Sequence, residues 1–160
     1  MRAVRYAILF GAIFASNASL AGTSAISLKV TALDPVVASG AKIMIRLTIT
    51  NKSKHSITYN NTSSFCDYPL KVATSSGAPA PETPFKKELG ECNNDPLRLL
   101  GRNIPVALKP GESASEEMEI TEYYDMSAPG KYIVQAERIF PGIGHFLSNV
   151  VSIGVTAKGN

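Results

Sequence analysis

Histidine and cysteine are the residues with which this chain could most directly do chemistry, and it has two of each. His55 lies between Lys54 and Ser56, and His145 follows Gly144 in a second turn-like stretch. Neither histidine has a sequence neighbour that marks it as a general base. The sequence also lacks a Gly-x-Ser-x-Gly nucleophile motif, a phosphate-binding loop and the His-Glu-x-x-His motif of zinc proteases. We therefore expect no catalytic residue, no metal site and no cofactor.

The two cysteines, Cys66 and Cys92, predict a disulfide bond. An exported chain meets an oxidising compartment in which disulfides form and persist. Closing a loop of this length would stabilise the fold by about 3 kcal/mol. The alternatives are a reactive thiol pair or half of a metal site, but the Cys-x-x-Cys spacing of such sites is absent.

An acidic segment is the other candidate for chemistry. Its six acids are Glu112, Glu116, Glu117, Glu119, Glu122 and Asp125. Paired carboxylates could serve acid/base catalysis or a cation site. Alternation along a strand from Ser113 to Thr121, however, places Glu117 and Glu119 on one outward face, and this pattern is typical of a solvated strand that resists edge pairing.

The first residues predict a signal peptide. Arg2 and Arg5 give a positive start, an apolar run covers residues 6–14, and small residues follow up to Ala21. The run is too short to span a bilayer. We expect removal of residues 1–21, with Ala18 as the alternative cleavage point, one mature domain over 22–160, a periplasmic or secreted location, and no stable membrane anchor afterwards.

Removal of the signal also lowers the net charge. The whole chain carries +3, and loss of Arg2 and Arg5 leaves 14 Lys and Arg against 13 Asp and Glu, or +1. This small charge argues against nucleic acid as a partner. Tryptophan is absent, which also argues against a stacking platform for sugars or single-stranded nucleic acid.

Period-two alternation predicts an all-β fold. The clearest strand runs from Lys42 to Thr50, and we expect it to form a hairpin with residues 56–60. Shorter alternating stretches occur at 26–32, 68–74, 104–108, 113–121, 131–140 and 146–156. Residues 141–145 are expected to be a hairpin loop, and 85–102 a long loop or short helical turn.

A turn near the end of the chain completes the fold prediction. Asp125, a Pro-Gly pair ending at Gly130, and Tyr132 at the start of a strand are typical of the corner where a chain crosses between two sheets. The tyrosine hydroxyl of such a corner bonds back to the preceding loop. The sequence thus predicts an immunoglobulin-like, two-sheet antiparallel β-sandwich of about seven or eight strands.

Several of these motifs occur together in known families. The order Leu47-Thr-Ile-Thr-Asn-Lys-Ser, Asp67-Tyr-Pro-Leu-Lys-Val, Leu108-Lys-Pro-Gly-Glu-Ser and Tyr124-Asp-Met-Ser-Ala-Pro-Gly-Lys-Tyr resembles small bacterial immunoglobulin-like domains. It is similar to the intracellular proteinase-inhibitor domain of bacilli and to the sandwich that precedes the catalytic domain in deuterolysin-type peptidyl-Lys metalloendopeptidases. This resemblance implies the fold and, as one candidate activity, protease inhibition.

The predicted function is a non-enzymatic binding module for another protein, with the oligomeric state open. The candidate contact residues lie in two loops: Asn93, Asn94 and Asp95 beside Cys92, and Ile143, Gly144 and His145 in the last hairpin. The alternatives are a secreted or periplasmic protease inhibitor, which would place an exposed loop in a protease cleft, and a small hydrolase or metal-dependent enzyme that would use the acidic segment.

Overall fold

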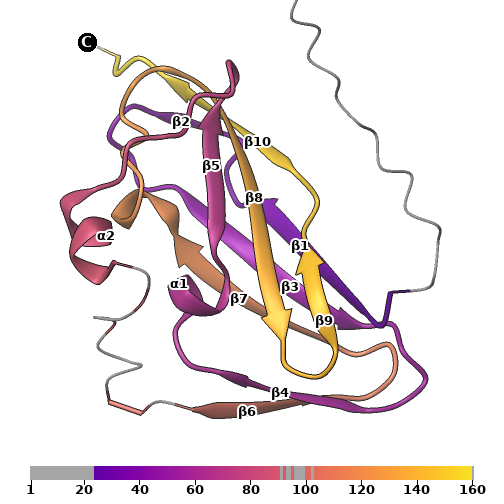
Figure 1. The fold of residues 1–160 in the computed structure, drawn as a ribbon. Helices are drawn as coiled ribbons and strands as arrows, with labels where there is room; N and C mark the ends of the chain where they lie inside the picture. The colour runs from indigo at the N-terminus through magenta and orange to yellow at the C-terminus, as the bar shows by residue number, and fades with distance from the viewer. Residues whose placement is uncertain (1–23, 91, 93–94, 96–99, 102, 160) are drawn as a thin grey trace, which may run out of the picture.

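Two β-sheets pack face to face, and a two-stranded ribbon lies across one end of them (Figure 1). The computed structural model describes residues 24–90, 92, 95, 100–101 and 103–159. The predicted signal peptide therefore lies outside the described residues. Among those that are described, no helix has the length and apolar character needed to cross a membrane.

The elements in chain order are β1 (Ile26–Ala32), β2 (Val36–Ala38), β3 (Met44–Asn51), β4 (Ile57–Asn61), α1 (Ser64–Asp67), β5 (Leu70–Thr74), α2 (Pro84–Leu89), β6 (Ile104–Leu108), β7 (Ser113–Glu119), the 3-10 turn η1 (Ile120–Glu122), β8 (Gly130–Phe140), β9 (Gly144–Leu147) and β10 (Val151–Thr156).

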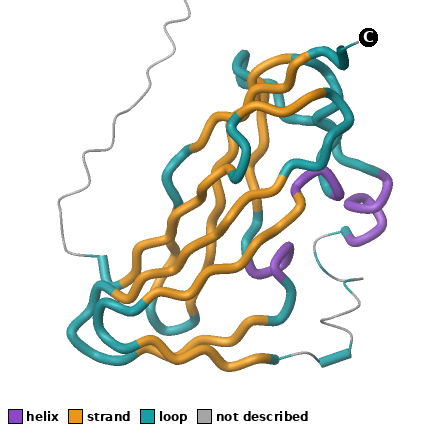
Figure 2. Tube along the Cα trace, turned by 180° about the vertical axis from the view of Figure 1, so that it is seen from behind, coloured by secondary structure: helices purple, strands orange, loops and turns teal. Residues whose placement is uncertain are grey.

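The first sheet has the strand order β1-β3-β7, and the second has the order β2-β10-β8-β5 with β9 pairing to the far half of β8. All of these pairs are antiparallel except that of β2 with β10. Strands β4 and β6 form the ribbon, which is also visible from behind (Figure 2). The all-β, immunoglobulin-like sandwich is thus confirmed, with more strands than the sequence indicated.

The core forms because apolar residues alternate along the central strands. Ile45, Leu47 and Ile49 of β3 are almost fully buried, and Tyr132 and Val134 of β8 face them from the second sheet. Three outward residues of β3, Arg46, Thr48 and Thr50, are polar and bond across to Glu117, Ser115 and Ser113 of β7. Alternation of this kind fixes one face of each strand to the core.

The predicted corner is present. The Tyr132 hydroxyl donates to the Ala128 carbonyl at 3.0 Å, and Gly130 opens β8. The Asp125 carboxylate accepts the hydroxyl and the N–H of Ser127, and these two hydrogen bonds lower the pKa of Asp125. The corner ties β8 to the loop before it.

The predicted hairpin between β3 and β4 is wrong. Both edges of β3 are already paired, with β1 and β7, so β4 pairs with β6. The buried side chain of Asn51 redirects the chain, since its Nδ2 donates to the carbonyls of His55 and Leu108. The polar turn after β3 therefore leads out of the sheet and into the ribbon.

The prediction of a loop over 141–145 is partly wrong, because Gly144 and His145 belong to β9. The acidic segment lies as the alternation predicted, with Glu117 and Glu119 on the outward face of β7. Glu117 pairs with Arg46 and Glu119 pairs with Lys42, each at 2.7 Å. The hydrogen bond from Lys42 lowers the pKa of Glu119.

Candidate functional site

The disulfide bond between Cys66 and Cys92 joins α1 to the long loop that precedes β6 and confirms the predicted pairing. The two Cα atoms are 5.6 Å apart, within the normal range for a disulfide. The bond fixes one side of α1, and α1 in turn forms a wall of the site described below.

The structure separates the predicted contact residues. Asn93 and Asn94 lie outside the described residues. Asp95 is 4% exposed and accepts the Ser63 hydroxyl at 2.6 Å, so its carboxylate holds the loop against the start of α1. Ile143 lies at the tip of the β8–β9 hairpin and lines a cavity there.

His145 lies on β9 opposite Ile139 and is not among the described residues that line that cavity. Its Nε2 is 3.4 Å from Glu137 Oε2, and the same carboxylate oxygen is 3.5 Å from Lys71 Nζ. His145 also lines a separate groove beside Leu28 of β1, whereas a side chain at neighbouring Gly144 would place its β-carbon 3.4 Å from the ring of Phe146. The structure thus does not bring His145 together with Ile143 in one site.

A buried arginine is the most unusual feature of this end of the sandwich. Arg138 of β8 is 4% exposed, and its guanidinium lies over the rings of Tyr59, Tyr68 and Phe140. The distances to the ring centroids are 4.8, 4.4 and 5.0 Å, within the range of cation–π contacts. Burial raises the pKa of Tyr59 and Tyr68, so both phenols stay neutral beside it.

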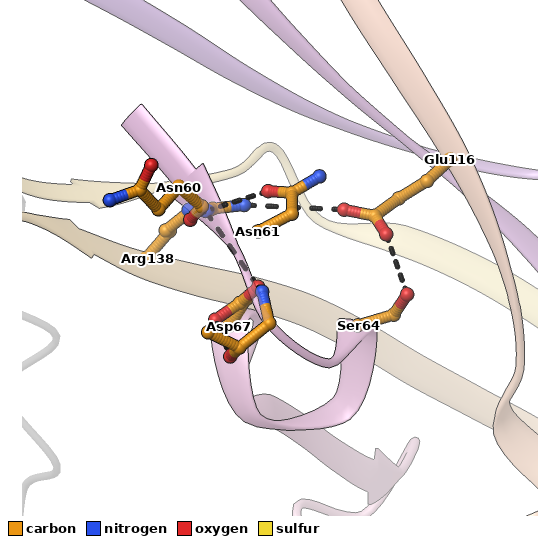
Figure 3. A network of polar contacts seen from close by, with 7 residues as sticks. Asn60, Asn61, Ser64, Asp67, Glu116 and Arg138 are labelled. Carbon is orange, nitrogen blue, oxygen red and sulfur yellow. Dashed lines mark hydrogen bonds and ion pairs between the residues drawn. The ribbon is translucent and has the colours of Figure 1, made fainter. Parts of the chain in front are cut away.

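Polar groups from β4 and α1 hold the guanidinium in place (Figure 3). Arg138 Nη2 donates to the Asn60 carbonyl at 2.8 Å and to Asn61 Oδ1 at 2.9 Å. The Asp67 carboxylate lies 3.9 Å away and caps the edge of β4 by accepting the backbone N–H of Thr62. The side chains of Arg138 and Asp67 thus make hydrogen bonds to this edge that a neighbouring strand would otherwise make.

Glu116 of β7 reaches the same arginine from the first sheet, so the cluster connects the two layers (Figure 3). Its Oε2 accepts the Ser64 hydroxyl, and its Oε1 is 4.0 Å from Arg138 Nη1. Those two facing atoms are buried and have no hydrogen-bond partner among the described residues. The cluster therefore holds two carboxylates around one guanidinium.

A cavity of about 350 Å³ opens beside this cluster, between β4 and the far half of β8. Its polar wall includes Thr58, Asn60 and Asp67, and its apolar wall includes Ile139 and Ile143. Ile139 is 71% exposed and Ile143 is 37% exposed, so two large apolar side chains face water at one cavity. We call this cavity the β4–β8 slot.

The slot runs between two strand edges. Along an antiparallel strand, successive residues direct their backbone N–H and C=O to opposite sides. The backbone N–H of Glu137 donates to the carbonyl of Pro69, on the β5 side of β8. Ile139 comes two residues later, so its backbone N–H and C=O point to the same side, beyond the start of β5. The Asn60 carbonyl points to Arg138, away from β6, and Thr58 shares that direction.

The sequence carried a signal for this site that the strand predictions passed over. Arg138 falls at an inward position of β8, in line with Tyr132, Val134 and Ala136, and Glu116 falls inward on β7. A charged residue at an inward position must find a partner or remain costly to bury. Two such residues of opposite charge on facing sheets predict a pair.

The described residues contain no group of three or more His, Cys, Asp and Glu side chains placed to hold a metal ion. What the slot offers is an exposed apolar wall, a rigid polar floor and two strand edges, at Thr58 and Ile139, to which no described strand pairs on the slot side. Such a surface can hold an extended chain.

No family model and no curated protein sequence matches the chain. Among solved structures, it is similar to the CARDB domain of a Pyrococcus furiosus protein in complex with di-metal ions. The TM-score is 0.43 at 10% identity, covering 83% of this chain and 94% of that domain. It is also similar to BslA, a bacterial hydrophobin, with a TM-score of 0.39 at 15% identity, covering 85% and 97%.

A third similar structure is a Listeria innocua β-glucosidase in complex with glucose, with a TM-score of 0.43 at 15% identity. The match covers 82% of this chain but 16% of the glucosidase. At these scores and identities the likeness carries no inference about function. The resemblance to proteinase-inhibitor and metalloendopeptidase sandwiches stays a prediction.

Proposed function

We propose that this protein is a non-catalytic binding module that takes up an extended segment of another polypeptide in the β4–β8 slot. The observation that carries the proposal is the facing of two strand edges, at Thr58 and Ile139, across a cavity with an exposed apolar wall. A bound strand would gain main-chain hydrogen bonds from the edges and a pocket for one of its side chains.

The two edges supply the main-chain part of the recognition. Arg138 and Asp67 already occupy the backbone groups of Asn60 and Thr62, so a partner strand would pair at the Thr58 end of β4. Pro105 of β6 fits this direction of the β4 backbone. It lies opposite Asn60, whose carbonyl points to Arg138, so the missing N–H of the proline costs no hydrogen bond inside the ribbon.

The apolar wall supplies the side-chain part. Ile139 and Ile143 would lose their contact with water when a partner's apolar side chain entered the slot, which contributes about 25 cal/mol for each Å² buried. Tyr59 and Phe140 pack edge to face with centroids 5.3 Å apart and join the two strands below the slot. The slot is therefore formed before a partner arrives, which lowers the entropic cost of binding.

Capture from a periplasmic extract of the source cells, followed by mass spectrometry, tests the proposal. Thr58→Pro removes a backbone N–H that none of the described strands uses, and Ile139→Asp places a charge on the apolar wall. Both variants should lose the partner that the native protein captures. The matched controls are Thr58→Ala, which keeps the N–H, and Val36→Asp, which charges an apolar residue exposed to 62% on β2.

The captured protein should bind through one segment, and a synthetic peptide of that segment should compete for the slot. Equal capture by the native protein, Thr58→Pro and Ile139→Asp would contradict the proposal. So would capture that depends on Val36.

A further inference from the structure

A second cavity lies on the other side of α1, between the start of β5 and the helix α2. It has a volume of about 600 Å³, in the range of small-molecule sites. Phe65 and Leu70 form its apolar floor together with the disulfide bond, and Lys86 and Lys87 lie at its rim. We call it the α2 pocket.

The ammonium group of Lys86 is fixed in this pocket. Its Nζ donates to Glu82 and, at 2.8 Å, to the Tyr124 hydroxyl, and it lies 4.1 Å from the centre of the Tyr124 ring. The Tyr124 hydroxyl in turn donates to the Leu70 carbonyl at 2.7 Å. Burial opposes the charge on Lys86, but its hydrogen bonds to Glu82 and Tyr124 raise its pKa, so the group stays protonated.

The charges at the rim do not cancel. An ammonium group has three N–H donors, and the contacts with Glu82 and Tyr124 use two of those on Lys86. Among the described residues that line the pocket, the Glu82 carboxylate balances one lysine, which leaves the charge of the exposed Lys87. The pocket thus combines an apolar floor with a net positive rim.

We infer that the α2 pocket binds a small organic anion with an apolar body. The acidic group of the ligand would accept from Lys86 and Lys87, and its ring or short chain would lie against Phe65 and Leu70. A positioned ammonium has already lost most of its side-chain freedom, so less entropy is lost when it binds an anion. This site takes a ligand of a different class from the β4–β8 slot.

Two dyes with the same aromatic body provide the test, because 8-anilinonaphthalene-1-sulfonate is anionic whereas N-phenyl-1-naphthylamine lacks the sulfonate. Fluorescence titration of the oxidised protein should show one saturable site that prefers the anion by about tenfold. Raising NaCl from about 0.05 to about 0.5 M should weaken binding of the anionic dye and leave the affinity for the neutral dye unchanged.

Lys87→Met should reduce the affinity for the anionic dye about threefold, and Lys86→Met should reduce it about tenfold. Neither variant should change the affinity for the neutral dye. Lys29→Met removes an exposed lysine on the outward face of the first sheet and should change neither affinity. Lys87→Met keeps all contacts of Lys86, so it tests the site even if Lys86→Met unfolds.

Amide chemical shifts in a titration with the anionic dye locate the site. Shifts centred on Phe65, Leu70 and Lys86 support the inference. It is overturned by shifts centred elsewhere, by equal affinity for the two dyes, or by a Lys87→Met variant that binds the anion like the native protein. None of these results depends on partner capture at Thr58 and Ile139.

Discussion

Arg138 shows how one residue can join three parts of the fold. Its guanidinium satisfies the Asn60 carbonyl on β4, lies beside Asp67 of α1, and faces Glu116 on the opposite sheet. An arginine suits this position because its planar group stacks on aromatic rings while its N–H donors reach outward. A lysine could provide the charge but not the stacking.

Replacement of Arg138 by methionine should destabilise the protein by about 3 kcal/mol, the range observed when one partner of a buried ion pair is removed. The Asn60 carbonyl would lose its donor, and two carboxylates would face each other without a cation. Urea denaturation of Arg138→Met and the native protein gives the difference directly.

Two further variants make the interpretation specific. Adding Glu116→Gln to Arg138→Met should restore about 1 kcal/mol, since it removes one of the unpaired charges. Arg46→Met breaks an ion pair on the outward face, with side chains 48% and 46% exposed, and should cost less than about 1 kcal/mol. Equal costs for Arg46→Met and Arg138→Met would show that burial of Arg138 has no energetic weight.

At the scale of elements, side chains cap strand edges at two seams, one beside the ribbon and one beside the first sheet. Arg138 and Asp67 cap β4 at one seam. At the other, the side-chain amide of Asn149 bonds to both backbone groups of Val30, accepting its N–H at 2.9 Å and donating to its C=O at 3.1 Å. An amide can do this because it carries a donor and an acceptor like a peptide group.

Asn149→Ala should therefore cost about 1–2 kcal/mol, for two hydrogen bonds at a partly buried edge. It should also speed hydrogen exchange at the Val30 amide, which we expect to be protected in the native protein. Asn149→Asp keeps the acceptor for the Val30 N–H but loses the donor, so it should retain that protection while losing part of the stability. An unchanged exchange rate at Val30 in Asn149→Ala would contradict this role.

The sequence predicted strands well and their pairing poorly. Alternation identified the buried face of β3 and β8, because burial of one face is a local property of each strand. The pairing of β4 with β6 depends on Asn51, whose side-chain amide donates to the carbonyl of Leu108 at the end of β6. The two residues are distant in sequence, so no local pattern encodes this contact. The slot and the α2 pocket were missed for the same reason, since their walls come from segments distant in sequence.

Across the whole molecule, the two proposed sites share one support. Cys66 and Pro69 line both the β4–β8 slot and the α2 pocket, so α1 and the start of β5 separate the two cavities. The disulfide holds this partition to the loop that carries Asp95. A redox change at one bond would therefore alter the walls of both sites.

The Cys66→Ala/Cys92→Ala double variant should lose about 3 kcal/mol of unfolding free energy. The bond closes a loop over a sequence separation of 26, and its loss frees that segment mainly in the unfolded chain. Urea denaturation in the absence of reductant measures the difference. Reductant should lower the unfolding free energy of the native protein to that of the double variant. It should leave the unfolding free energy of the double variant unchanged. If the two proteins unfold at the same urea concentration when oxidised, the bond contributes no stability, and α1 is held by the packing of its Phe65 ring on Tyr123.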